Sequence, residues 1–240
     1  MRMLFIIAAL LLVAAGAPEI RALGPLGVPG RMFPKPDRPV ADIVTDVWGD
    51  TRQRDIAGET RQLTEKLAIK PGQTVADIGA GAGYDSLRLA RIVGPRGTVI
   101  AEDIRPEYLT GLVKSVRAQG LKNVVTALGE ADDPRLKPGS VDTAILIHMY
   151  HEISAPYAFL YNLAPALKAG GRVGVMDAAR ATPQHGTPPE LLKCEFEAVG
   201  YRELSRTEMD GGLGYLMVFS APKPGERPRP EAIKVCRLGR

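Results

Sequence analysis

A glycine-rich turn between an apolar strand and a helix constrains this chain more than any other feature. The segment 75–78 has the character of a buried strand, and glycines occupy positions 79, 81 and 83 of the loop that follows it. Glycine permits positive φ angles and the close approach of a ligand to the backbone, and the start of a helix offers unpaired N–H groups. This geometry predicts a nucleotide-like ligand at the turn.

The acid before the turn indicates which class of ligand binds there. A dinucleotide pyrophosphate requires the spacing G-x-G-x-x-G. Tyr84 and Ser86 stand where the third glycine would be needed. The carboxylate of Asp77 would also repel a diphosphate, whereas it would attract a cation. The sequence therefore favours a positively charged adenosine derivative over NAD.

Five segments in register with this turn resemble the class I S-adenosylmethionine-dependent methyltransferases, whose first motif is D/E-x-G-x-G-x-G. They are 77–83, 97–107, 129–133, 140–148 and 167–173, within a resemblance that covers roughly residues 60 to 220. More narrowly, 148–152 (HMYHE) and 185–189 (HGTPP) are similar to a bacterial branch of predicted methyltransferases with export-type N-termini. The resemblance implies a Rossmann-like α/β sheet of strand order 3-2-1-4-5-7-6, with strand 7 antiparallel, and S-adenosyl-L-methionine as cofactor.

The resemblance also implies a set of cofactor-binding residues. They are Asp77, Gly79, Ala80, Gly81, Gly83, Asp103, Ile104, Glu130, Ala131, Asp132 and His148. Asp103 lies 20 residues beyond Gly83, the spacing that a strand–helix–strand return needs for a ribose-binding acid. Glu102 competes with Asp103 for the ribose, and strand alternation with the family register favours Asp103. Glu130 and Asp132 both remain candidates for the adenine amino group.

The three histidines, His148, His151 and His185, follow the fourth and fifth predicted strands, so we expect them to face one cleft. A histidine there would act as a general base toward a substrate oxygen or nitrogen. Metal binding with Glu152 or Asp177 is a second interpretation, and lining the pocket or packing is a third. We take His148, His151, Tyr150 and His185 as catalytic candidates and assign no metal site.

Charge and composition bear on the acceptor. The net charge of +4 is mild, basic residues gather near the chain ends, and aromatic residues make up 5% of the chain. Few stacking platforms and no strong basic surface argue against nucleic acid. We therefore expect methyl transfer to a small molecule. The alternative is a non-catalytic or metal-binding protein that retains the methyltransferase fold.

The chain divides into four segments. Residues 1–17, with a basic start and 14 apolar residues, predict a signal peptide or an anchor, although a spanning helix needs about 20. A Pro/Gly-rich linker or wrapping arm (18–45), the domain (46–221) and a Pro-rich basic tail (222–240) follow, and we expect the stretch 222–230 to be mobile. We expect an exported (periplasmic) or inner-membrane-anchored protein, with a cytoplasmic one as the alternative. Any membrane contact is expected through the N-terminus alone.

Strand and helix patterns alternate from about residue 74 to 178, which is typical of a parallel sheet covered on both faces. The predicted helices are 51–69, 84–93, 106–119, 155–168 and 189–199, and the segments 201–207 and 214–220 predict a closing strand pair. Cys194 and Cys236 match no zinc spacing, so they form either one disulfide or two free thiols.

Overall fold

The computed structural model describes residues 20–43 and 51–237, so the predicted signal or anchor (1–17) lies outside the described residues. Seven strands form one sheet in the order β3-β2-β1-β4-β5-β7-β6. They are β1 (Thr74–Ile78), β2 (Thr98–Asp103), β3 (Val124–Leu128), β4 (Val141–Ile147), β5 (Leu167–Asp177), β6 (Arg202–Met209) and β7 (Gly214–Ser220). Strand β7 pairs antiparallel with both β5 and β6. The predicted sheet order and the antiparallel seventh strand are confirmed.

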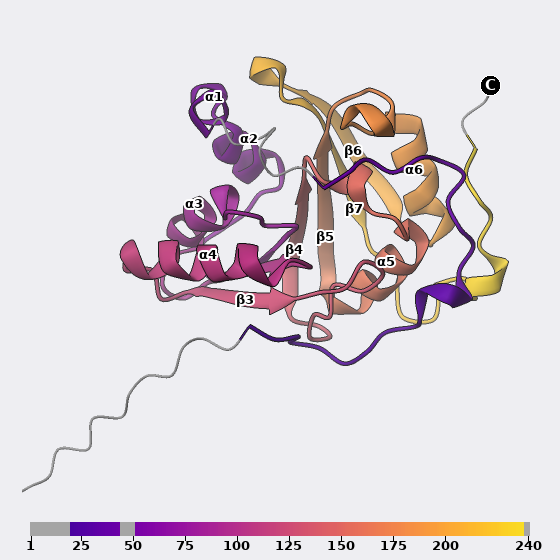
Figure 1. The fold of residues 1–240 in the computed structure, drawn as a ribbon, viewed down its shortest axis with the longest axis horizontal. Helices are drawn as coiled ribbons and strands as arrows, with labels where there is room; N and C mark the ends of the chain where they lie inside the picture. Colours follow the sequence, from indigo (N-terminus) through magenta and orange to yellow (C-terminus); the bar gives the residue numbers. More distant parts are fainter. Residues whose placement is uncertain (1–19, 44–50, 238–240) are drawn as a thin grey trace, which may run out of the picture.

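Helices cover both faces of this sheet (Figure 1). They are α1 (Thr51–Ala57), α2 (Glu59–Lys66), α3 (Tyr84–Val93), α4 (Pro106–Ala118), α5 (Pro156–Leu163) and α6 (Pro189–Ala198). Successive strand residues point to opposite faces. Accordingly, Val75 packs in a core with Leu63 of α2 and Leu89 of α3, whereas Ala76 packs in a core with residues of α5 and α6.

Two predicted helices differ from the observed ones. The predicted helix 51–69 is divided into α1 and α2 by Gly58, whose φ is 66°. The predicted helix 155–168 ends early, because Pro165 lies in a short 3-10 turn (Ala164–Ala166) that leads directly into β5. The segment expected as a turn into the fifth strand therefore already belongs to β5, and the register with β4 shifts between Val141 and Thr143.

The Pro/Gly-rich segment is a wrapping arm over its described residues 20–43. It begins beside β3, where Leu128 N–H donates to Arg21 O (3.0 Å), and passes along α5 toward the sheet (Figure 1). Farther along, Arg38 forms a buried ion pair with Glu195 of α6 (2.9 Å). The arm ends beside β4, where Ala41 N–H donates to the carbonyl of His151 (3.1 Å). It therefore reaches from one edge of the sheet to its centre.

The C-terminal tail also contacts the domain, at Arg227 and more extensively beyond the stretch 222–230 that is predicted to be mobile. Arg227 donates to Tyr161 O (2.8 Å) and lies 4.2 Å from the centre of its ring. Ile233 and Cys236 are buried. Cys236 forms a disulfide with Cys194 of α6, which resolves the alternative that the sequence left open. Among the described residues, no helix is long and apolar enough to cross a membrane.

The disulfide is expected to stabilise the fold, because it joins residues 42 positions apart and restricts the unfolded chain. Loop-closure entropy for such a crosslink predicts that Cys236→Ser lowers the unfolding free energy by about 2–4 kcal/mol. Urea unfolding followed by circular dichroism measures the change. Cys194→Ser should give the same loss, and reductant should lower the unmodified protein to the level of either variant. Identical midpoints with and without reductant would contradict the expectation.

Candidate active site

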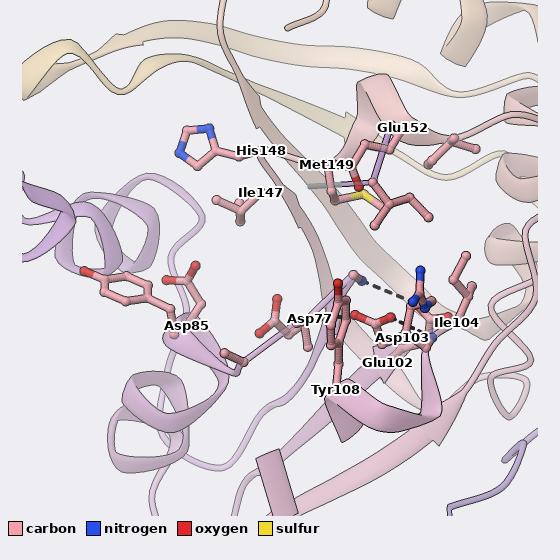
Figure 2. Close-up of a pocket in the computed structure, with 18 of the residues that line it drawn as sticks. Asp77, Asp85, Glu102, Asp103, Ile104, Tyr108, Ile147, His148, Met149 and Glu152 are labelled. Atoms are coloured by element: carbon pink, nitrogen blue, oxygen red, sulfur yellow. Dashed lines mark hydrogen bonds between the residues drawn. The ribbon is translucent and has the colours of Figure 1, made fainter. Parts of the chain in front are cut away.

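A cavity of about 670 Å³ opens at the carboxyl ends of β1, β2 and β4. Ligands of open α/β sheets bind at this edge. Most of the predicted cofactor-binding residues line it, as Figure 2 shows for several of them. They are Asp77, Gly79, Ala80 and Gly81 after or within β1, Asp103 and Ile104 at the end of β2, Glu130 and Ala131 after β3, and His148 after β4. Their roles in binding stay predictions.

The glycine turn after β1 forms the floor of this cavity. Gly79 and Gly81 have φ angles of 65° and 51°, in the region that favours glycine. A Cβ on Gly79 would lie 2.9 Å from the side chain of Met149. Gly83 lies outside the lining, because it begins α3 and packs so closely on α4 that an added Cβ would be 2.1 Å from Leu112. The structure thus gives Gly83 a packing role and does not bring it to the cavity.

Asp103 anchors the turn to β2. Its Oδ2 accepts a hydrogen bond from Gly81 N–H (2.9 Å), and its Oδ1 accepts one from Arg105 N–H (2.8 Å). Burial raises the pKa of Asp103, and these backbone donors oppose the rise. The neighbouring Glu102 also lines the cavity, but burial and the nearby Asp103 raise its pKa well above the usual value. Asp103 is therefore the more readily ionised of the two acids, in line with the ribose role predicted for it.

Asp77 lies beneath the turn and is buried. Its Oδ2 accepts a hydrogen bond from the hydroxyl of Ser86 (2.6 Å). Burial raises the pKa of Asp77 to about 6, and the Ser86 hydroxyl partly offsets this effect. A cationic ligand in the cavity would favour the ionised form of this carboxyl.

Arg54 of α1 belongs to the site, although sequence reasoning did not find it. Its guanidinium lines the cavity, pairs with Glu59 and with Asp85 (2.8 Å), and lies 3.6 Å from the centre of the Tyr84 ring. No motif marks Arg54, because its position depends on the packing of α1 against α3. With its charge balanced by two acids, the cavity keeps an acidic character.

The structure separates the two acids proposed for the adenine amino group. Glu130 lines the cavity and pairs with Arg135 (2.6 Å). Asp132 does not reach the cavity, because its carboxylate accepts a hydrogen bond from Gly30 N–H of the arm (2.7 Å). The adenine role therefore stays a prediction for Glu130, whereas Asp132 holds the arm in place.

The three histidines do not face one cleft, which corrects the expectation. His148 lines the cavity, and its Nε2 lies 3.2 Å from Oε2 of buried Glu59. His148 and Glu152 point in opposite directions from their loop (Figure 2). His151 is buried beside Asp177, with the ring of His185 at 5.5 Å. Tyr150 lies in the core, where its hydroxyl donates to Glu195 (2.8 Å). Of these four catalytic candidates, His148 alone lines the cavity.

Comparisons with known proteins agree with this architecture. Residues 69–208 match a family model described as a methyltransferase domain. Arsenite methyltransferase of Halobacterium salinarum is 33% identical over 119 residues, which are 48% of this chain and 30% of that protein. A tRNA (adenine(58)-N(1))-methyltransferase of Thermus thermophilus is 33% identical over 146 residues, 57% of this chain and 54% of that protein.

A crystal structure of an S-adenosylmethionine-dependent methyltransferase from Aquifex aeolicus superposes with a TM-score of 0.62 and 25% identity, over 68% of this chain and 88% of that one. The matched region covers about a third of the arsenite methyltransferase and about half of the tRNA methyltransferase.

The raised pKa of Asp77 predicts a pH dependence of ligand binding. Below its pKa of about 6, Asp77 becomes protonated and neutral, so its attraction for a sulfonium is lost. One unit below the pKa, about a tenth of the protein keeps the charge. Between pH 7.5 and 5, the affinity for S-adenosylmethionine should therefore fall by up to about tenfold relative to that for uncharged-sulfur S-adenosylhomocysteine. Calorimetry with both ligands measures the ratio, and Asp77→Asn should make it independent of pH. If the ratio of the two affinities stays constant with pH in the unmodified protein, Asp77 does not attract the sulfonium.

Proposed function

Because this chain belongs to the class I S-adenosylmethionine-dependent methyltransferases, we propose that it transfers a methyl group from S-adenosylmethionine to a small-molecule acceptor. The acid-lined glycine turn carries the proposal. Asp77 lies beneath the turn, and Asp103 is held at its side by Gly81 N–H. Such a cavity suits a cationic adenosyl ligand, since a carboxylate beside the turn repels a diphosphate.

The residues that form the walls of the cavity support the proposal of a small acceptor. Ala41, Asp42 and Ile43 of the arm and Arg54 of α1 contribute to its walls, and its volume of about 670 Å³ lies in the range typical of small-molecule sites. Acidic groups on its lining, among them Asp42 and Glu152, disfavour a polyanion. Although one relative acts on tRNA, the mild net charge and low aromatic content of this chain favour a small molecule.

Methyl transfer requires mainly that the acceptor is aligned with the methyl group. S-adenosylmethionine, when bound, supplies an activated methyl group, so holding the acceptor at attack distance provides most of the acceleration. We assign the acceptor side to the loop after β4, where His148 lines the cavity. Burial alone would raise the pKa of Glu59, but hydrogen bonds from His148 and Arg54 lower it below its usual value. An ionised Glu59 would stabilise His148 when the imidazole accepts the proton of the acceptor.

The proposal is tested by cofactor binding and turnover. Asp103→Ala removes an acid that is expected to bind the ribose and that orders the turn, so it should weaken S-adenosylhomocysteine binding by about 10–100-fold. Isothermal titration calorimetry measures the change, with Glu107→Ala, an exposed acid of α4, as the matched control. A panel of hydroxyl, amine, thiol and arsenite acceptors with labelled cofactor then tests for turnover. Equal affinity in Asp103→Ala would overturn the cofactor site, and binding without transfer to any acceptor would favour the non-catalytic alternative.

We further propose that residues 1–17 place the domain outside the cytoplasm. The apolar run after Arg2 has the length of a signal-peptide core. The disulfide between Cys194 and Cys236 supports this proposal, because such bonds persist in oxidising compartments.

Fractionation of a bacterial host that expresses the full chain tests this location. We expect the protein in the periplasmic or inner-membrane fraction, with both cysteines unreactive toward iodoacetamide before reduction. Mass spectrometry of the N-terminus distinguishes cleavage from anchoring. A cytosolic protein with two reactive thiols would contradict the proposal.

A further inference from the structure

Beside the cofactor cavity, three metal-binding side chains converge on one point. His151 and Glu152 come from the short 3-10 helix after β4 (Tyr150–Glu152), and His185 comes from the loop after β5. One ligand atom of each lies within 4.8 Å of the others. Residues from two separate loops thus meet at the carboxyl ends of two neighbouring strands.

One ring nitrogen of His151 is buried without a hydrogen-bond partner in the described part of the chain. Its side chain is fully buried, and its Nε2 has no hydrogen-bond partner among the described residues. Its other nitrogen, Nδ1, lies 3.0 Å from Oδ2 of Asp177. Since a carboxylate accepts hydrogen bonds, Nδ1 carries a proton, and the neutral imidazole then has its lone pair on Nε2. An unsatisfied buried polar atom costs about 1–3 kcal/mol, a cost that a bound cation would remove.

Asp177 is positioned to orient this imidazole. Its carboxylate accepts hydrogen bonds from the Thr187 hydroxyl (2.7 Å) and from Ala178 N–H (2.8 Å), in addition to its contact with His151. A carboxylate that fixes the distal nitrogen of a histidine is the usual support of a metal-ligating imidazole. The arm adds a further constraint, because Ala41 N–H donates to the carbonyl of His151 (3.1 Å).

The backbone of His185 is held in an unfavourable conformation next to this nitrogen. Its φ is 56°, in the left-handed region that side-chain-bearing residues seldom adopt. Its carbonyl accepts a hydrogen bond from Arg180 (3.1 Å), and Thr187 N–H donates to Ala178 O (2.9 Å), so the loop folds back onto the end of β5. The two imidazoles then meet edge to face, 5.5 Å apart.

We propose that His151, His185 and Glu152 bind a divalent transition-metal ion. Two imidazoles and a carboxylate match the ligand sets of zinc sites that keep a fourth position open, and imidazole donors exclude a preference for Mg²⁺ or Ca²⁺. Glu152 also lines the cofactor cavity, so the proposed metal site adjoins that cavity. None of the three ligands belongs to the glycine turn or is Asp103, so the metal site and the expected cofactor site can be tested separately.

Titration of the metal-depleted full-length protein with Zn²⁺ and with Co²⁺ tests the site. We expect one tight equivalent of Zn²⁺ by calorimetry, and visible Co²⁺ bands of a four- or five-coordinate ion. His185→Ala should weaken binding at least about tenfold, whereas Gln184→Ala, its neighbour on the same loop, should leave it unchanged. Because His185 lies on a loop and is partly exposed, its variant should keep the circular dichroism spectrum of the unmodified protein.

Two further variants separate the outcomes. Asp177→Asn, which changes the support of His151 without removing a ligand, should weaken Zn²⁺ binding by about 10–100-fold. Asp103→Ala should weaken cofactor binding by about 10–100-fold and leave Zn²⁺ binding intact, so failure of the metal site is distinguishable from failure of the proposed function. Absence of stoichiometric binding, or equal Zn²⁺ affinity in the His185→Ala and Gln184→Ala proteins, would overturn the proposal.

Discussion

Hydrogen bonds between the turn after β1 and the end of β2 determine the shape of the whole site. Gly81 N–H donates to the Asp103 carboxylate (2.9 Å), and Ala80 N–H donates to the carbonyl of Glu102 (2.8 Å). These bonds hold the left-handed glycine backbone against the neighbouring strand, where a side chain at Gly79 would collide with Met149. The acid that is predicted to bind the ribose therefore also orders the turn.

Segments that are distant in the sequence complete the walls of the cavity at the edge of the sheet. Hydrogen bonds join the arm to Asp132, Asp133 and α5. Farther along the chain, the arm forms one wall of the cavity. α1 closes another wall through Arg54, which joins Glu59 to Asp85. On the far side of the molecule, the disulfide ties the tail to α6. The described parts of the arm and of the tail thus both pack against the methyltransferase domain, and the arm also contributes to the wall of the cavity.

Local patterns predicted much of this structure. The helix after the turn occupies 84–93 as expected, since a glycine at each end bounds an apolar stripe. The strand order followed from motifs in register. The predicted helix 155–168 was too long, because the prediction did not take into account Pro165, which lies in the 3-10 turn after α5. Asp132 and Glu130 were equivalent in the sequence, and the contact of Asp132 with Gly30, 102 residues away, separates them. The expected single histidine cleft was wrong because His151 turns to Asp177 and His185, away from the cavity that His148 lines.

The sequence by itself determined the glycine turn, the acids on either side of it and the class of ligand, and its resemblance to the methyltransferase family implied the order of the strands. The turn and its acids depend on residue spacing within one strand–turn–helix unit, which short-range geometry encodes. Only the tertiary structure decided that Asp103 orders the turn, that Cys194 meets Cys236, and that His151 turns to Asp177 and His185 instead of the cofactor cavity. Each of these outcomes requires two segments far apart in the chain to pack together, and the energy of such a contact has no local signature.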